Sequence, residues 1–101
     1  MSHQLKLKVL WLGNLLGLGV DQLTFKNQYS LTAYYFWPRT EAWEQLKSEL
    51  DSKPWLHKKE KIEILNLASD VMNYWRQYRN VDRIENVKIN FSEVDFIELQ
   101  N

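Results

Sequence analysis

The first organised pattern in the chain is an alternation of apolar and polar residues on both sides of Gly13 and Asn14. The segments LKLKVLWL and LLGLGVDQL flank this dipeptide. A Gly-Asn pair between two such runs is typical of a two-residue β-hairpin turn, in which the glycine supplies a positive φ. We therefore predict an antiparallel hairpin formed by these two segments.

The register of this hairpin follows from placing Leu12 opposite Leu15. Alternate pairs then form a wholly apolar face that consists of Leu7, Val9, Trp11, Leu16, Leu18 and Val20. The other face is open and partly cationic, with Leu10 opposite Gly17, Lys8 opposite Gly19 and Lys6 opposite Asp21. A slip by one residue would destroy this separation, so the pattern specifies one register.

Two helices are predicted after an aromatic, β-prone stretch that follows a turn-like segment at 26–30 and ends at Pro38. The first helix has Thr40 as its expected N-cap and ends before Pro54. One side of it carries Ala42, Trp43, Leu46 and Leu50. The second helix should run from about His57 to Tyr78. Its apolar stripe consists of Ile62, Ile64, Leu65, Ala68, Val71, Met72 and Trp75.

The C-terminal part of the chain alternates as a strand would. Val87, Ile89 and Phe91 come first, and the parity then shifts to Val94 and Phe96. We expect the tail 87–99 to dock as extended structure rather than as a helix. The predicted fold is therefore α+β: an N-terminal antiparallel β-hairpin packed on two helices, with a C-terminal extended segment that can add a strand. Residues 1–80 would form one α+β domain, and residues 81–101 a C-terminal extension that docks on this domain or on a partner.

Composition limits the possible functions. A chain of 101 residues has the length of one domain with one core. Thirteen basic and thirteen acidic residues leave no overall field that could drive binding, so any contact with nucleic acid must be local. The chain has no cysteine, which excludes disulfides and thiolate chemistry.

The segment AYYFWPRTEAW concentrates aromatic side chains between Ala33 and Trp43. Three uses compete for it: core, contact with another macromolecule, or a small-molecule pocket. Strand alternation sends Tyr35 and Trp37 to one face, which we assign to the core together with Trp43. Tyr34 and Phe36 point the other way, so they are the candidate partner surface.

Clusters of cations give the clearest functional hint, although a solvated polar face is an equal alternative for each of them. Lys58, Lys59 and Lys61 occupy the first turn of the second helix, where the helix dipole favours acids, and a bound phosphate would explain them. Arg76, Arg79 and Arg83 are spaced to align if this helix continues past Tyr78. Arg39 precedes the first helix, and Lys6 and Lys8 lie on the open hairpin face.

Catalysis, cofactor binding and metal binding have little support in the sequence. The histidines are His3 and His57, and the latter neighbours three lysines. There is no glycine-rich phosphate loop, no clustered set of metal ligands and no apolar run long enough for a bilayer. We therefore predict a protein that is not an enzyme, with no cofactor, metal, membrane contact or small-molecule substrate.

Three longer runs carry a resemblance to a known family. These are KVLWLGNLLGLGVDQ, LTAYYFWPRTEAWEQLKSELDSKPW and IEILNLASDVMNYW, and the likeness covers roughly Leu5 to Trp75. They resemble the plastid-specific ribosomal protein 3 family of the small ribosomal subunit in chloroplasts and cyanobacteria. One departure is His57, where members of the family usually have serine, a better N-cap.

The resemblance implies a structural protein of the small ribosomal subunit that contacts its rRNA and neighbouring ribosomal proteins and supports translation. A small protein–protein interaction module that uses its aromatic surface without RNA is the alternative. We expect the protein to be made where it acts, because the start of the chain lacks the features of a transit peptide. The expected location is therefore the stroma of a plastid that encodes the protein, where it would be bound to the ribosome. The chain has nine lysines and four arginines, a ratio typical of proteins that an AT-rich genome encodes. This ratio favours a plastid, and the cyanobacterial cytoplasm is the alternative location.

Overall fold

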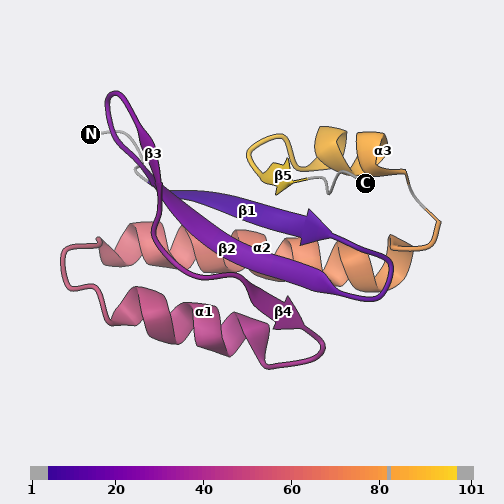
Figure 1. Cartoon of the computed structure of the whole chain (residues 1–101), viewed down its shortest axis with the longest axis horizontal. Coiled ribbons are helices and arrows are strands. Elements are labelled where there is room, and N and C mark those ends of the chain that lie inside the picture. The colour runs from indigo at the N-terminus through magenta and orange to yellow at the C-terminus, as the bar shows by residue number, and fades with distance from the viewer. Residues whose placement is uncertain (1–4, 82, 98–101) are drawn as a thin grey trace.

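The structure of the protein is a computed structural model that describes residues 5–81 and 83–97. These residues form one mixed sheet and three helices (Figure 1). The elements follow along the chain in the order β1 (Leu5–Trp11), β2 (Leu16–Leu23), β3 (Gln28–Ser30), β4 (Tyr35–Trp37), α1 (Ala42–Asp51), α2 (Lys58–Tyr78), α3 (Ile84–Asn90) and β5 (Asp95–Ile97). The predicted α+β class is confirmed.

The hairpin of β1 and β2 has the predicted register at every pair, from Leu5 opposite Gln22 to Trp11 opposite Leu16. Its turn is closed by a hydrogen bond from the Leu12 N–H to the Leu15 carbonyl, 3.1 Å long. The expected positive φ at Gly13 is wrong, because no described glycine has one. The apolar pattern of the strands, rather than an unusual glycine conformation, therefore specifies the pairing.

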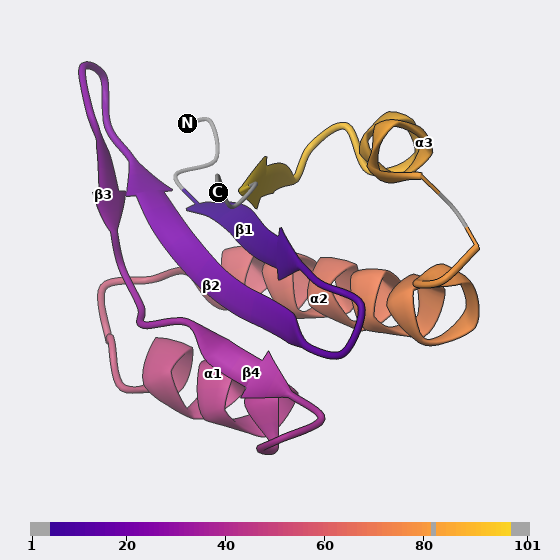
Figure 2. The same cartoon turned by 45° about the vertical axis from the view of Figure 1, so that its right-hand side comes forward.

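Strand β2 is the centre of the sheet, whose order is β3-β2-β1-β5 with β4 also paired to β2. β3 pairs with β2 from Asp21 to Leu23, and β4 pairs with it from Leu16 to Leu18. Thr32 lies between β3 and β4 in the chain and is buried. Its hydroxyl accepts a 3.0 Å hydrogen bond from the Val20 N–H, which holds this connection against β2. The segment predicted to be turn-like at residues 26–30 thus ends in strand β3. The turn before it extends away from the helices (Figure 2) and carries Phe25, which is 97% exposed.

Helices α1 and α2 cover one face of the hairpin (Figure 1). The fully buried core joins the apolar hairpin face to both helices through Leu7, Val9, Leu16, Leu18, Val20, Ala42, Leu46, Leu50, Ala68, Val71 and Trp75. The bounds predicted for the second helix are confirmed. Ile62 is wrong as a member of the apolar stripe, because it is 47% exposed.

The predicted N-cap of α1 is wrong by one residue. Glu41 is the N-cap, with no hydrogen bond from its side chain, and its carbonyl accepts the first helical bond from the Gln45 N–H at 3.0 Å. The Thr40 hydroxyl instead lies 2.9 Å from the Phe36 carbonyl oxygen. Thr40 therefore stabilises the turn after β4 and also contacts Gln45 Oε1 of α1 at 2.7 Å, but it does not cap the helix.

The C-terminal segment combines a helix and a strand. The prediction that residues 87–91 are extended is wrong, because they lie in or directly after α3. Val87 is fully buried and Phe91 packs at the core edge, four residues apart as on one side of a helix, whereas Ile89 is 76% exposed. The predicted extra strand is confirmed: β5 pairs in parallel with β1 from Lys8 to Leu10. Leu99 lies outside the described residues, and the division into a domain of residues 1–80 and an extension stays a prediction.

Two glycines, Gly17 and Gly19, lie where aromatic rings pack closely on the outer face of the hairpin. A Cβ atom on Gly17 would lie 2.9 Å from Cε1 of Phe36 and 3.1 Å from Cβ of Leu10, and one on Gly19 would lie 3.3 Å from Cδ1 of Tyr34. Both glycines thus leave room for the aromatic rings of the β4 region. This close approach explains why glycine stands at these strand positions.

We expect Gly17→Ala to lower the free energy of unfolding by roughly 1–3 kcal/mol, because the Cβ of Leu10 is fixed to the paired strand and cannot move aside. Chemical denaturation measures this loss. Gly13→Ala is the matched control, since its Cβ would meet only Asn80 Oδ1 at 4.0 Å. Equal stability of the two variants would contradict the close packing at Gly17.

Candidate nucleic-acid interface

The turn after β4, the start of α1 and the end of α2 lie toward the same end of the molecule (Figure 1), and three arginines belong to these segments. Arg39 is exposed in the turn after β4, and Arg76 is exposed in the last turn of α2. Arg79 follows that helix, and its guanidinium lies 4.6 Å from the centre of the Trp75 ring. We call these three residues the arginine end. Arg83 does not align with them, because α2 stops at Tyr78 and Arg83 is the N-cap of α3.

Three lysines lie in the first turn of α2, at the other end of the helix, and we call them the lysine end. Lys58 and Lys59 are exposed, and Lys61 Nζ lies 3.4 Å from Asp51 Oδ1. The hydrogen bond from Lys47, assisted by Lys61, lowers the pKa of Asp51 below its ordinary value. The N-cap His57 makes no side-chain hydrogen bond to the helix. Two exposed cations therefore face the positive end of the helix dipole.

Lys6 and Lys8 lie in a network of charges on the outer face of the sheet. Lys8 is 8% exposed, and its Nζ lies 2.6 Å from Asp21 Oδ1 and 2.7 Å from Ser30 Oγ. Lys6 Nζ lies 3.6 Å from Asp95 Oδ1. Asp21 thus forms its ion pair with Lys8 rather than with Lys6, its partner in the strand register. Because Lys8 is enclosed and paired, we exclude it from the proposed RNA contact, and Lys6 is at most a secondary one.

Tyr34 and Phe36 lie half-buried on the same outer face, above Gly19 and Gly17. Lys8 Nζ is 4.9 Å from the centre of the Tyr34 ring. Burial, and then the negative charges of Asp21 and Asp95, raise the pKa of the Tyr34 hydroxyl. The Tyr34 and Phe36 rings contact each other, with their centroids 6.4 Å apart. Their use as a partner surface stays a prediction.

A small aromatic pocket borders the arginine end. It has a volume of about 180 Å³ and is lined by Trp37, Trp43, Ser69, Met72, Asn73 and Arg76. Both indoles are held in place: Trp43 Nε1 donates a 3.0 Å hydrogen bond to the Leu65 carbonyl, and Trp37 meets Trp75 edge to face at 5.5 Å. Sequence reasoning assigned both tryptophans to the core. They do pack against it, but each remains half-buried and borders this pocket.

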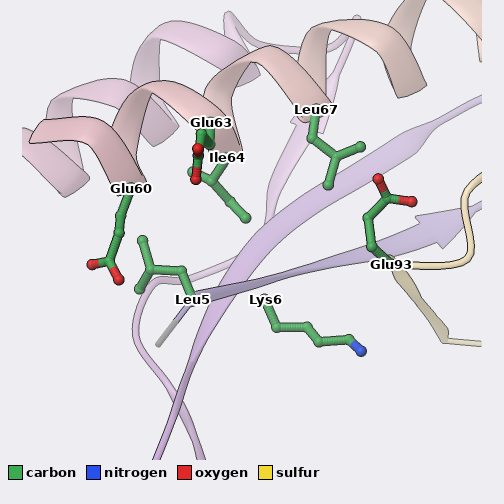
Figure 3. Close-up of a pocket in the computed structure, with 7 residues that line it drawn as sticks. All are labelled: Leu5, Lys6, Glu60, Glu63, Ile64, Leu67 and Glu93. Atoms are coloured by element: carbon green, nitrogen blue, oxygen red, sulfur yellow. The ribbon is translucent and has the colours of Figure 1, made fainter. Parts of the chain in front are cut away.

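A second pocket, of about 400 Å³, lies between the start of β1 and α2 (Figure 3). Leu5, Ile64 and Leu67 contribute apolar side chains to its lining, together with Lys6. Three carboxylates also line it, those of Glu60, Glu63 and Glu93 (Figure 3). Negative charge of this kind repels a phosphate backbone, so this pocket does not suit contact with RNA.

Neither a metal centre nor a membrane segment is found in residues 5–81 and 83–97. No three His, Cys, Asp or Glu side chains in this part of the chain are grouped so that they could hold a metal ion. Among the described helices, none is both long enough and apolar enough to span a bilayer.

Comparison with known proteins gives matches along most of the chain. Residues 31–78 match the model of a family described as plastid and cyanobacterial ribosomal protein (PSRP-3/Ycf65). The small ribosomal subunit protein cS23 of Gracilaria tenuistipitata var. liui is 41% identical over 90 residues, which cover 89% of this chain and 91% of that protein. A probable small ribosomal subunit protein cS23 of Synechococcus sp. (strain JA-2-3B'a(2-13)) is 54% identical over 70 residues, 69% of this chain and 71% of that protein. The cS23 protein of Cyanidium caldarium is 51% identical over 74 residues, 73% of each chain.

Proposed function

Because the chain belongs to the plastid and cyanobacterial ribosomal protein family PSRP-3/Ycf65, we propose that it is a structural component of the small ribosomal subunit that contacts ribosomal RNA through both ends of α2. The similarity to the Gracilaria small-subunit protein, which extends over nearly the full length of both chains, carries this assignment. The role is structural rather than enzymatic. It is performed on the ribosome of a plastid, with a cyanobacterium as the alternative host.

The arginine end is the first part of the proposed RNA contact. Arg76 and Arg39 are exposed, and Arg76 Nη2 donates a 3.1 Å hydrogen bond to Asn73 Oδ1. This bond leaves the other N–H groups of the guanidinium for a ligand. The planar guanidinium can bind a phosphate with two parallel hydrogen bonds, which suits contact with an RNA backbone.

The lysine end is the second part of this contact. Lys58 and Lys59 are exposed and oppose the helix dipole at the start of α2, and a phosphate at this position would remove the conflict. Lys61 contributes less, because Asp51 already neutralises it in part. The two ends are roughly 30 Å apart at 1.5 Å per helical residue. One RNA hairpin could therefore contact both.

Neighbouring ribosomal proteins are the second class of partner that we propose. The outer face of the sheet suits them, because no described helix covers it and its charges are paired among themselves. Tyr34 and Phe36 add apolar area to a face that carries little free charge. Such a face fits a protein surface better than an RNA backbone.

Sedimentation of small ribosomal subunits tests the proposed function. The protein should migrate with intact subunits at low salt and should be released by ribonuclease or by high salt, because its proposed contacts are to phosphate. An untreated gradient is the control. Association that ribonuclease does not affect would favour the alternative, a protein–protein interaction module that needs no RNA. Absence from the subunit fractions at low salt would overturn the proposed function.

A further inference from the structure

We propose that the pocket between Trp37, Trp43 and α2 binds a single unpaired nucleobase of the RNA. This inference rests on the proposed function and specifies which chemical group the arginine end recognises beside phosphate. The pocket combines aromatic walls, polar side chains and an arginine at its border. These are the parts that proteins use to hold a base that is splayed out of an RNA strand.

The size of the pocket fits one base. Its volume is about 180 Å³. For comparison, a protein cavity of about 150 Å³ holds one molecule of benzene, a ring similar in size to a pyrimidine. A stacked base pair or a turn of peptide would need considerably more room. The pocket therefore has room for a single ring.

The walls are fixed before any ligand arrives. Trp43 is tied to α2 by its hydrogen bond to the Leu65 carbonyl, and Trp37 is held against buried Trp75. Neither indole has to give up side-chain freedom on binding, which lowers the entropic cost of stacking a base on it. Because both rings are only half-buried, each still presents surface to a ligand.

The polar side chains that line the pocket suit the edge and the phosphate of a nucleotide. Ser69 offers a hydroxyl and Asn73 an amide, which can each donate and accept hydrogen bonds with a base edge. Arg76 is attached to Asn73 by a 3.1 Å hydrogen bond and is exposed, so it can bind the phosphate of the same nucleotide. Arg39, two residues after Trp37, adds a second cation nearby. This positive charge favours a nucleotide over an apolar protein side chain of similar size.

Blocking the pocket tests the inference without removing any charge or either tryptophan. Ser69→Met fills the space, whereas Asn66→Met places the same side chain at an exposed position of α2 outside the pocket. Both variants should unfold at similar temperatures. Loss of one stacked base should weaken association of Ser69→Met with small subunits about tenfold, with wild-type affinity for Asn66→Met. Equal affinity of the two variants would overturn the base pocket.

Ultraviolet cross-linking of small subunits that carry the wild-type protein identifies the occupant. A nucleotide linked to Trp37, Trp43 or Met72 is the expected result. If the protein is bound and released by ribonuclease, but the pocket residues link only to another protein, the base pocket is wrong while the proposed function stands. If ribonuclease does not release the protein, the RNA contact itself fails and the base pocket fails with it.

Discussion

Replacement of Trp75 by alanine should lower the free energy of unfolding by about 3–5 kcal/mol. Trp75 is 2% exposed in the core, and its Nε1 donates a 2.7 Å hydrogen bond to the Leu12 carbonyl at the end of the hairpin. It also supports Trp37 at 5.5 Å and Arg79 at 4.6 Å. The substitution would leave a cavity, an unpaired Leu12 carbonyl and no aromatic ring beside Arg79. The fold should therefore lose stability, and the arginine end should lose a contact that positions Arg79.

Denaturant titration followed by circular dichroism measures this effect. Phe25→Ala is the control, because Phe25 is exposed at the turn between β2 and β3, and its removal should change stability by less than about 0.5 kcal/mol. Small domains are stable by only about 5–15 kcal/mol, so Trp75→Ala should be close to unfolding at elevated temperature. A loss below about 1 kcal/mol would contradict the packing of Trp75 between hairpin and helix.

Reversal of charge at the arginine end should have the largest effect on ribosome association. The double variant Arg39→Glu and Arg76→Glu should bind small subunits roughly 100-fold more weakly at low salt, since two charge-assisted hydrogen bonds are lost. The logarithmic salt dependence of binding should become flatter by about 1.4–1.8, which is about 0.7–0.9 for each phosphate contact. Reversal of Lys58 and Lys59 should act in the same direction.

Binding measured over a salt series separates these contacts from a general effect of net charge. Reversal of Asp70, an exposed acid on the polar side of α2, should leave affinity and salt slope unchanged or slightly improve affinity. The same expectation holds for Glu63 at the acidic pocket. Wild-type occupancy for both the arginine and the lysine variants would identify these residues as ordinary solvated charge.

The hairpin and α2 could be predicted because their patterns are local. Alternation allows only one register that buries a whole apolar face, and the structure has this register. The C-terminal segment was ambiguous, because Val87 and Phe91 are four residues apart, a spacing that suits a strand and a helix equally. Which of the two forms depends on contacts with distant residues, such as the edge-to-face contact of Phe91 with Tyr74 at 5.4 Å. No periodicity in the sequence reports such a contact.

The candidate site was predictable as single residues and not as an arrangement. Arg39, Arg76 and the tryptophans stand out in the sequence by residue type, but they lie in β4, α1, α2 and the turn between the first two. The pocket exists only because these elements meet. Burial of Lys8 was also hidden, since it depends on Asp21 and Ser30 from two other strands. Sequence patterns identified the cations, and tertiary contacts determine which of them can reach a ligand.

The parallel pairing of β5 with β1 has a consequence for how the protein folds during synthesis. Lys8 pairs with Asp95, so nearly the whole described chain must be made before this side of β1 finds its strand partner. The hairpin and α2 need only nearby residues and can assemble earlier, whereas closing so long a loop is slow. Until then the nascent chain exposes an open strand edge of the kind that pairs with other chains. The pairing of β5 then covers Lys8, Val9 and Leu10 of this edge.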